Sequence, residues 1–445
     1  MNHNKLNAKP ALLAVLLLYA GGAAASDLLE TYRAALAQDA QYAAARAAKA
    51  AGEEKLPQGR AQLLPSVNFN ANTSINDMRT QYTGNMLFPS GHQRYNSHGY
   101  GVTLTQPLFR EQNWALYSES ELQVVQSDAQ LRQAEQELAL RTARAYFDVL
   151  LARDNVALAA AQKTAIAEQL AQARRNFEVG SATVTDIQEA EARHDLVVSQ
   201  EIAAQSNLEV KRRTLQQLTN AVPGELDAPG PAFRLEPPQP ASIDKWVEQA
   251  ATQNQQVVIA QAGAELAGKE VERNRGGHLP TVDLVASHTR TVATGGAFGI
   301  GSDQTLTSVG VQANLALFQG GATQSKWREA EANRERARYE LESARRGVEL
   351  QTRQAYLGIT NGIAQVQALQ QALKSSLSLL EATKLGYETG SRTNLDVLNA
   401  QQQLYATRRD LYQAQYNYLL SELNLAAAAG ALDEGSVERV NRALH

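Results

Sequence analysis

The chain has 445 residues, a formal net charge of −4 at pH 7 and no cysteine. The absence of thiols excludes disulfides, thiolate metal sites, a cysteine nucleophile and the bacterial lipoprotein class that needs an N-terminal cysteine. The acidic balance argues against nucleic acid as a partner. Charged residues make up 20% and aromatic residues 6% of the chain, a composition typical of long, solvated, packed helices.

The N-terminus has the pattern of a secretory signal peptide, predicted over residues 1–25. Lys5 and Lys9 precede an apolar run at 11–20, and small residues follow at 23–25. About ten apolar residues are too few for a spanning helix, which needs roughly 20. The mature chain should therefore begin at Ser26, outside the cytoplasm. It is then either soluble in the periplasm or in contact with a membrane through β-strands.

Residues 27–63 read as one alanine-rich helix that ends before Pro65, because proline forbids continuation. The period then changes to two over the strand pair 65–107. Val67 and Phe69 alternate with Asn68 and Asn70, and a second strand follows at 100–105. An apolar face opposite a face of Asn and Thr is more typical of a transmembrane barrel than of a soluble sandwich, whose polar face more often carries Lys and Glu.

Between these strands, residues 76–98 are rich in Asn, Arg, Tyr, Gly and His and are expected to form an exposed loop. His92 and His98 are six residues apart with no acidic pattern nearby. We therefore interpret them as solvated loop residues and not as metal ligands.

A long helix is predicted over 111–177, where a heptad pattern runs without proline or glycine. At 1.5 Å per residue it would reach about 100 Å. Such a rod must extend beyond any compact body. Its partner is the return helix 183–220, which is shorter, so the helix 27–63 should continue its line.

The turn between these two helices occurs twice in the chain. Residues 177–190 return in similar form as residues 387–400. In each copy a glycine ends one helix, a threonine caps the next and an acid lies in its first turn. The chain therefore consists of two similar halves, and the shared tip positions are Gly180/Gly390, Ser181/Ser391, Thr183/Thr393 and Asp186/Asp396.

A proline-rich linker over 223–241 joins the first repeat, 26–222, to the second repeat, 242–432. The second repeat has the same order of elements, and a C-terminal tail follows at 433–445. The expected elements are a helix from about 242 to 279, the strand pair 280–317, the long helix 323–387 and the return helix 393–430.

No pattern for catalysis stands out. The glycine-rich stretch 295–301 lacks the Lys-Ser/Thr of a phosphate loop and is interpreted as a loop between strands. His194 and Asp195 are adjacent on a helix and do not face each other. The sequence therefore predicts no enzyme, no cofactor and no metal site.

The segment 386–400, followed by Tyr416-Asn-Tyr-Leu-Leu420, resembles the TolC family of trimeric outer-membrane export channels, and the resemblance covers essentially the whole mature chain. It implies an α+β membrane protein: a trimeric 12-stranded transmembrane β-barrel with four strands per chain, continued by a long periplasmic α-helical coiled-coil barrel. Each chain would contain two structural repeats. The protein would lie in outer-membrane lipid and act as a passive duct.

The resemblance also implies partners and a gate. The partners are a periplasmic adaptor (membrane fusion protein) and an inner-membrane ABC or proton-driven pump. The adaptor would dock at Gly180, Ser181, Gly390 and Ser391. Thr185 and Asp186 would hold Tyr387 and Arg392 in a periplasmic gate, and Asp396 would form an acidic ring at the pore entrance. The tip acids have a second interpretation as first-turn residues that favour the helix dipole.

One departure from the family and several alternatives remain at this point. The family archetype has a second acid where this chain has Asn399. A homotrimer is expected, because four strands cannot close a barrel and two copies would leave a filled lumen. The alternative function is a periplasmic coiled-coil adaptor or scaffold with a small soluble β domain. The exported substrate, either secreted proteins or small toxic compounds, is not determined by the sequence.

Overall fold

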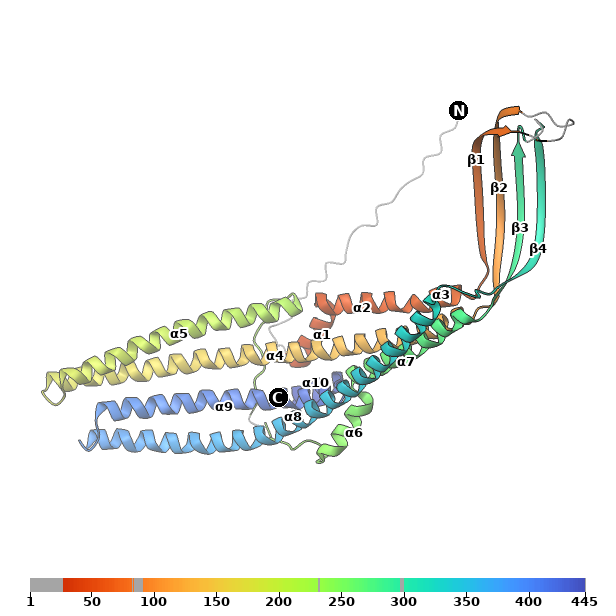
Figure 1. Ribbon diagram of the computed structural model, residues 1–445. Coiled ribbons are helices and arrows are strands. Elements are labelled where there is room, and N and C mark those ends of the chain that lie inside the picture. The colour runs from red at the N-terminus through yellow and green to blue at the C-terminus, as the bar shows by residue number, and fades with distance from the viewer. Residues whose placement is uncertain (1–26, 82, 84–90, 231–232, 297–299, 445) are drawn as a thin grey trace, which may run out of the picture.

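The computed structural model describes residues 27–81, 83, 91–230, 233–296 and 300–444. A four-stranded sheet stands at one end of a long helical body, and two helical hairpins form the other end (Figure 1). The predicted signal peptide lies outside the described residues.

Two very long helices run through the helical body. They are α4 (Glu111–Glu178, 68 residues) and α8 (Ala322–Glu388, 67 residues). Each turns back into a helix of about half its length, α5 (Val184–Thr219) or α9 (Asn394–Ala428). Both turns lie at the end of the rod opposite the sheet (Figure 1). The rods are about 100 Å long, as 1.5 Å per residue requires.

Shorter helices continue the lines of α5 and α9 toward the sheet (Figure 1). The segment 27–63, expected as one helix, forms three: α1 (Leu28–Gln38), α2 (Ala40–Glu53) and α3 (Lys55–Ala61). The segment from 242, also expected as one helix, forms α6 (Ile243–Gln253), α7 (Gln255–Arg275) and the 3₁₀ turn η1 (Gly276–His278).

The first break has a physical cause in Asp39, which has an extended backbone and accepts the backbone N–H of Tyr42 at 2.7 Å. Arg141 of α4 donates to both carboxylate oxygens of Asp39, at 3.0 and 3.2 Å. Asn254 breaks the second repeat in the same way, and its amide donates to the Ala428 carbonyl at 2.9 Å. Side-chain capping bonds compete with helix continuation, and here they prevail.

The sheet is antiparallel throughout, with the order β1-β2-β3-β4. The strands are β1 (Ser66–Thr80), β2 (Gly91–Phe109), β3 (Thr281–Ala293) and β4 (Ser302–Asn314). Pairing of β2 with β3 joins the two repeats, and β1 and β4 form the edges. β1 and β2 extend well beyond the alternating stretches that the sequence showed at 67–70 and 100–105.

The expected loop 76–98 is therefore mostly strand, because β1 and β2 remain paired as far as Thr80 and Gly91. The sequence pattern missed this extension because polar residues on both faces hide the period of two. His92 lies on β2, with its Nε2 atom 2.5 Å from Asp77 Oδ1. Residues 82 and 84–90 of that loop, and 297–299 of the second loop, lie outside the described residues.

Neighbouring rows across the sheet have opposite character. One row runs Val67–Leu104–Ala286–Val309, and the next runs Asn68–Thr103–Ser287–Ser308. Successive residues of a strand point to opposite faces. The sheet therefore has an apolar face and a polar face, and the apolar face is bare: Val67, Phe69 and Val309 are 63%, 67% and 71% exposed.

The main hydrophobic core lies midway along the rod, where α1, α4, α9 and α10 (Glu434–Arg442) meet. The proline-rich linker crosses this core. Arg153 donates to the Leu226 carbonyl at 2.9 Å, and the Tyr418 hydroxyl bonds both the N–H and the carbonyl of Glu236. The expected C-terminal tail contains α10, whose Asn441 accepts from the Leu28 N–H at 2.9 Å.

The two repeats correspond at the level of single residues. Pro65 matches Pro280 before the strands, an offset of 215, and Gly180 matches Gly390 at the tips, an offset of 210. Thr142 and Thr352 are both fully buried. Asn220 and Gly430, which end α5 and α9, both have positive φ angles, of 54° and 74°.

We expect Gly430→Ala to destabilise the protein more than Gly390→Ala. Both glycines have φ of +74°, which costs an alanine roughly 1–2 kcal/mol. A Cβ on Gly430 would also lie 2.3 Å from the Gln253 carbonyl oxygen, whereas a Cβ on Gly390 would meet no atom within 4 Å. Thermal unfolding followed by circular dichroism measures the difference, and equal losses would contradict the close backbone contact.

Candidate functional site at the hairpin tips

Each long helix ends in the same hydrogen-bonded turn. In the first tip Gly180 has φ of +76°, and its N–H donates to the Phe177 carbonyl at 2.9 Å. The Ser181 N–H donates to the Asn176 carbonyl at 2.8 Å. The second tip repeats both bonds, around Gly390 and Ser391. This is the Schellman arrangement, and it explains why glycine ends each helix.

A reciprocal capping box starts each return helix. Asp186 Oδ2 accepts from the N–H and the hydroxyl of Thr183, at 2.7 and 2.8 Å, and the Asp186 N–H donates to Thr183 Oγ1. Asp396 and Thr393 make the same three bonds. The first-turn interpretation of the tip acids is thus correct as far as it goes, since one oxygen of each carboxylate serves the local turn.

These bonds also affect the charge of Asp396. The backbone N–H of Thr393, then its hydroxyl, lowers the pKa of the Asp396 carboxyl, and the nearby Arg392 adds to the effect. The carboxylate is therefore fully ionised at neutral pH. A lowered pKa contributes stability above the unfolded-state pKa, and this contribution is lost as pH falls through the folded-state pKa.

The four predicted gate residues lie within one turn of the two tips. Thr185 is exposed and Asp186 is half-buried at the start of α5. Tyr387 lies in the last turn of α8, and Arg392 lies in the tip that follows it. The Tyr387 hydroxyl reaches the first hairpin, where it accepts from Asn176 Nδ2 at 3.0 Å. Among the described residues, no hydrogen bond joins this hydroxyl to Thr185 or Asp186.

Arg392 stays on its own hairpin. Its side chain lies over Gly386, where a Cβ would come within 2.6 Å of Arg392 Cγ. Among the described residues of a single chain, Arg392 forms no ion pair with Asp186. The predicted pairing therefore needs a second copy, and the gate assignment stays a prediction.

A buried amide contact between the hairpins was missed by sequence reasoning. Asn394 is 1% exposed, and its Oδ1 accepts from Gln169 Nε2 of α4 at 2.5 Å. Its Nδ2 donates to the Asp186 carbonyl at 3.3 Å. The available signal was a difference between the repeats, because the equivalent position in the first tip is Val184, which is 54% exposed.

Asn399, where the family archetype has an acid, faces the first hairpin. Its Oδ1 accepts from Arg193 Nη2 of α5 at 3.1 Å, and the same arginine also donates to Gln402. The guanidinium thus bridges α5 and α9. Asn399 contributes a hydrogen bond between the hairpins and no charge.

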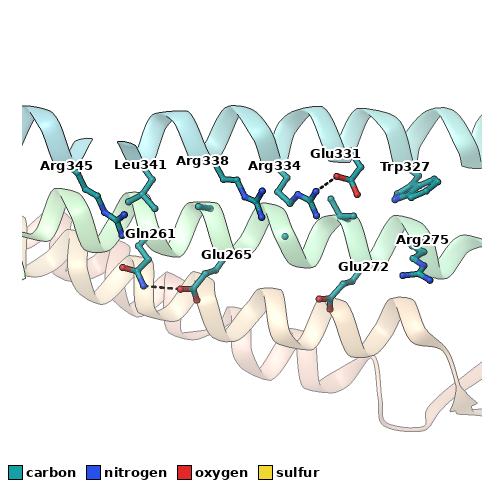
Figure 2. Close-up of a pocket in the computed structure, with 13 residues that line it drawn as sticks. Gln261, Glu265, Glu272, Arg275, Trp327, Glu331, Arg334, Arg338, Leu341 and Arg345 are labelled. Carbon is teal, nitrogen blue, oxygen red and sulfur yellow. Dashed lines mark hydrogen bonds and ion pairs between the residues drawn. The ribbon is translucent and has the colours of Figure 1, made fainter. Parts of the chain in front are cut away.

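The described residues contain no group of three or more His, Cys, Asp or Glu side chains placed to hold a metal ion. A groove of about 570 Å³ lies between α7 and α8, near the sheet end of α8 (Figure 2). It carries charges of both signs, including Glu265, Arg275 and Arg338, and an ion pair between Arg334 and Glu331. It does not converge on a chemical centre.

Across the described ranges, no helix combines the length and apolarity needed to cross a membrane.

Comparison with known proteins adds a family. A family model described as outer membrane efflux protein matches residues 31–221 and 246–431, one match for each repeat. The alkaline protease secretion protein AprF of Pseudomonas aeruginosa is 35% identical over 437 residues, which cover 96% of this chain and 89% of the relative. Outer membrane protein TolC of Escherichia coli is 31% identical over 430 residues, covering 94% of this chain and 85% of TolC.

Solved structures show the same fold. The outer membrane protein VceC from Vibrio cholerae superposes with a TM-score of 0.76 at 19% identity, over 91% of this chain and 96% of that chain. The predicted fold class, a four-stranded sheet continued by a long helical domain in two repeats, is confirmed. The family is one of outer-membrane efflux proteins, so neither a periplasmic scaffold nor an enzyme describes this chain. The chain belongs to the outer membrane efflux protein family, the TolC family of bacterial outer-membrane channels with a periplasmic extension.

Proposed function

We propose that three copies of this chain form a passive exit duct, which an inner-membrane pump and its periplasmic adaptor open at the hairpin tips. The observation that carries the proposal is the sheet with two unpaired edges, β1 and β4, continued directly into two helical hairpins. Membership in the family of outer-membrane channels supports it.

The number of chains in the duct follows from the need to close the β-barrel. An open sheet edge is not tolerated in lipid, so β4 of one copy must pair with β1 of the next. Bacterial single-chain barrels start at about eight strands, and a barrel of that size has its interior filled by side chains. Three copies supply twelve strands and an open lumen. The apolar row through Val67 and Val309 would face lipid, and the polar row through Asn68 and Ser308 would face water.

The cargo is proposed to include secreted proteins, because AprF is described as a protein for alkaline protease secretion. Small toxic compounds are the second candidate, favoured by the efflux description of the family. The described chain presents no catalytic group for either cargo, so the pump supplies both energy and selectivity. The exposed tip residues Gly180, Ser181, Gly390 and Ser391 are the proposed adaptor contacts.

The gate is proposed to close by contacts between copies. Arg392 is exposed and forms no ion pair with another described residue, while Asp186 Oδ1 remains outside the capping box. Convergence of the tips around a threefold axis would bring these opposite charges together. Each exposed pair contributes only about 0.2–1 kcal/mol, but threefold symmetry repeats every contact. Such a gate holds in the resting state and yields to a docking pump.

The pore entrance is proposed to carry three carboxylates, one Asp396 from each copy. The second acid of the archetype is absent, because this chain has Asn399 at that position. The Asn399 amide oxygen accepts a hydrogen bond from Arg193. Half the charge of a six-carboxylate ring gives a weaker attraction for cations at the closed mouth.

Deletion of the gene tests the export function. We expect loss of one or more secreted proteins from the culture medium, and higher sensitivity to small toxic compounds if the duct also serves drug pumps. Complementation with the wild-type gene is the control. A deletion strain with unchanged secretion and unchanged sensitivity would contradict the proposed export role.

The gate assignment predicts that Arg392→Ser combined with Tyr387→Phe raises single-channel conductance in planar bilayers and leaves assembly intact. The reason is that two contacts per copy that hold the second hairpin are lost. The matched control is Arg409→Ser with Tyr412→Phe, the same changes on α9 away from the tip, which should conduct like wild type. Unchanged conductance in an assembled gate variant would refute the assignment.

The buried amide contact predicts a coupled loss of stability. Asn394→Ala leaves the Gln169 amide unpaired, which costs roughly 1–3 kcal/mol. Gln169→Ala in the same background should add little, so a double-mutant cycle in thermal unfolding should give a coupling of about 0.5–3 kcal/mol. The control cycle pairs Asn394→Ala with Gln162→Ala and should show additive losses. Additive losses in the Asn394–Gln169 cycle as well would show that this contact does not contribute to stability.

A further inference from the structure

The groove between α7 and α8 holds hydrogen-bond donors that have no acceptor among the described residues. It lies near the sheet end of α8 and has a volume of about 570 Å³ (Figure 2). Two atoms in its wall, Trp327 Nε1 and Arg334 Nε, are buried and have no hydrogen-bond partner in the described chain. Both are N–H groups. A buried donor without an acceptor is costly, so this wall favours a ligand that brings acceptor oxygens.

Three further arginines line the same groove without a counter-charge. They are Arg275 at the end of α7, and Arg338 and Arg345 of α8. All three are exposed, and none forms an ion pair with another described residue. Helical side chains lean toward the N-terminus of their helix, which for α8 is the sheet end. Figure 2 shows this lean for the arginines of α8, so their positive charge is displaced toward the sheet.

The acids of the groove do not neutralise these arginines. Glu331 is held by an arginine one turn further along α8, and Glu272 pairs with Lys269 at 2.9 Å. Glu265 accepts a hydrogen bond from Gln261 at 3.1 Å. Glu265 and Glu272 also line the neighbouring groove, and Figure 2 shows both on the side of α7 that faces α4. The seam between α7 and α8 therefore has an excess of positive charge.

The first repeat closes the equivalent seam with an ion pair. Lys49 of α2 pairs with Asp128 of α4 at 3.2 Å. The repeat offsets of 215 and 210 carry these two positions onto Ala264 of α7 and Arg338 of α8. The second repeat thus has a cation where the first has an acid, and an alanine where the first has its partner. The charge of Arg338 is left without a counter-charge across the seam.

We propose that this seam binds a phosphate group, which a phospholipid headgroup of the adjoining membrane leaflet supplies. A phosphodiester offers acceptor oxygens only, and guanidinium groups match it with paired N–H donors. The location agrees, because only the turn η1 and residues 279–280 separate Arg275 from β3. Basic pockets beside a membrane bind anionic headgroups. The inference goes beyond the exit duct and assumes no number of copies, since both walls of the groove belong to one chain.

The groups of the groove have different roles in this site. Trp327 and Arg275 lie nearest the sheet and donate to the phosphate. An indole ring suits a membrane boundary, because it combines an apolar body with one N–H donor. Between them and the far end of the groove, the floor is open at Gly268, where a Cβ would meet no atom within 4 Å. Arg338 and Arg345 lie farther along α8 and attract the anion.

Titration with a lipid tests the site directly. The purified mature chain in a non-ionic detergent is titrated with short-chain phosphatidylglycerol while tryptophan fluorescence is recorded. We expect a saturable change in emission that is lost in Trp327→Phe, which assigns the signal to one of the three tryptophans. Trp327→Phe keeps an aromatic ring and loses the indole N–H. Its affinity, measured from the rise in unfolding temperature with added lipid, should fall by about tenfold.

Charge removal tests the arginines. Arg275→Gln with Arg338→Gln should weaken phosphatidylglycerol binding by about tenfold or more, whereas the same two positions changed to lysine should retain most of it. The matched control is Arg328→Gln with Arg336→Gln, which removes the same charge from exposed positions of α8 outside the groove and should bind like the wild type. Equal weakening in both glutamine variants would show a response to total charge alone and would overturn the site.

Inorganic phosphate and phosphatidylcholine identify the source of the phosphate group. We expect phosphatidylglycerol to bind more tightly than phosphatidylcholine, whose choline cancels the charge, and inorganic phosphate to bind more weakly than either lipid. Inorganic phosphate that binds as tightly as phosphatidylglycerol would overturn the lipid as the source. No response of the wild type to any of the three would overturn the phosphate site, and the proposed export role would stand or fall separately by the deletion strain.

Discussion

The lipid bilayer offers no hydrogen-bonding partner to a polypeptide backbone, and this constraint governs the architecture of the chain. Its sheet ends in two strands, β1 and β4, whose outer edges pair with no further strand among the described residues. Lipid does not tolerate such edges. The proposed trimer removes these edges by pairing copies with one another. In that trimer the apolar face on Val67, Phe69 and Val309, exposed in the single chain, would turn toward lipid.

Because the chain is an internal duplication, each copy carries both surfaces that meet where one repeat packs against the other. The β2–β3 pairing and the contact of α4 with α7 make one junction inside the chain, held in part by Arg273 and Glu119. The same surfaces, in diverged form, remain open on the flanks. Divergence is concentrated where the environments differ: a buried alanine on α4 corresponds to the exposed Tyr339 on α8.

The hairpin tips combine two roles with different strengths. Capping boxes at Thr183 and Thr393 fix the turn geometry through bonds within each hairpin. Contacts between the hairpins are made mainly by side chains, among them Tyr387 with Asn176, Asn394 with Gln169 and Arg193 with Asn399. A tip whose backbone is fixed within each hairpin can move as a unit. That property suits the proposed passive duct, in which docking of a partner would open the tips.

Much of the secondary structure of this protein could be predicted from local sequence signals. Glycine stops, threonine caps, the heptad runs of α4 and α8 and the alternation in β1 depend on residues close together in the chain, so the long rods, the tips and the two sheet faces could be predicted. The duplication and the family motif around Gly386 added the channel fold.

The helix breaks, the full strand lengths and the contacts between the hairpins depend on residues that are distant in the sequence. The helix break at Asp39 depends on Arg141 of another helix, and the break at Asn254 depends on the Ala428 carbonyl. The full length of β1 depends on its ladder with β2, because Asn76 and Asp77 carry no alternating pattern of their own. Asn394 and Asn399 gained their roles from Gln169 and Arg193. A hydrogen bond formed between segments hundreds of residues apart leaves no local period, so only the tertiary structure could reveal which polar side chains join the two hairpins.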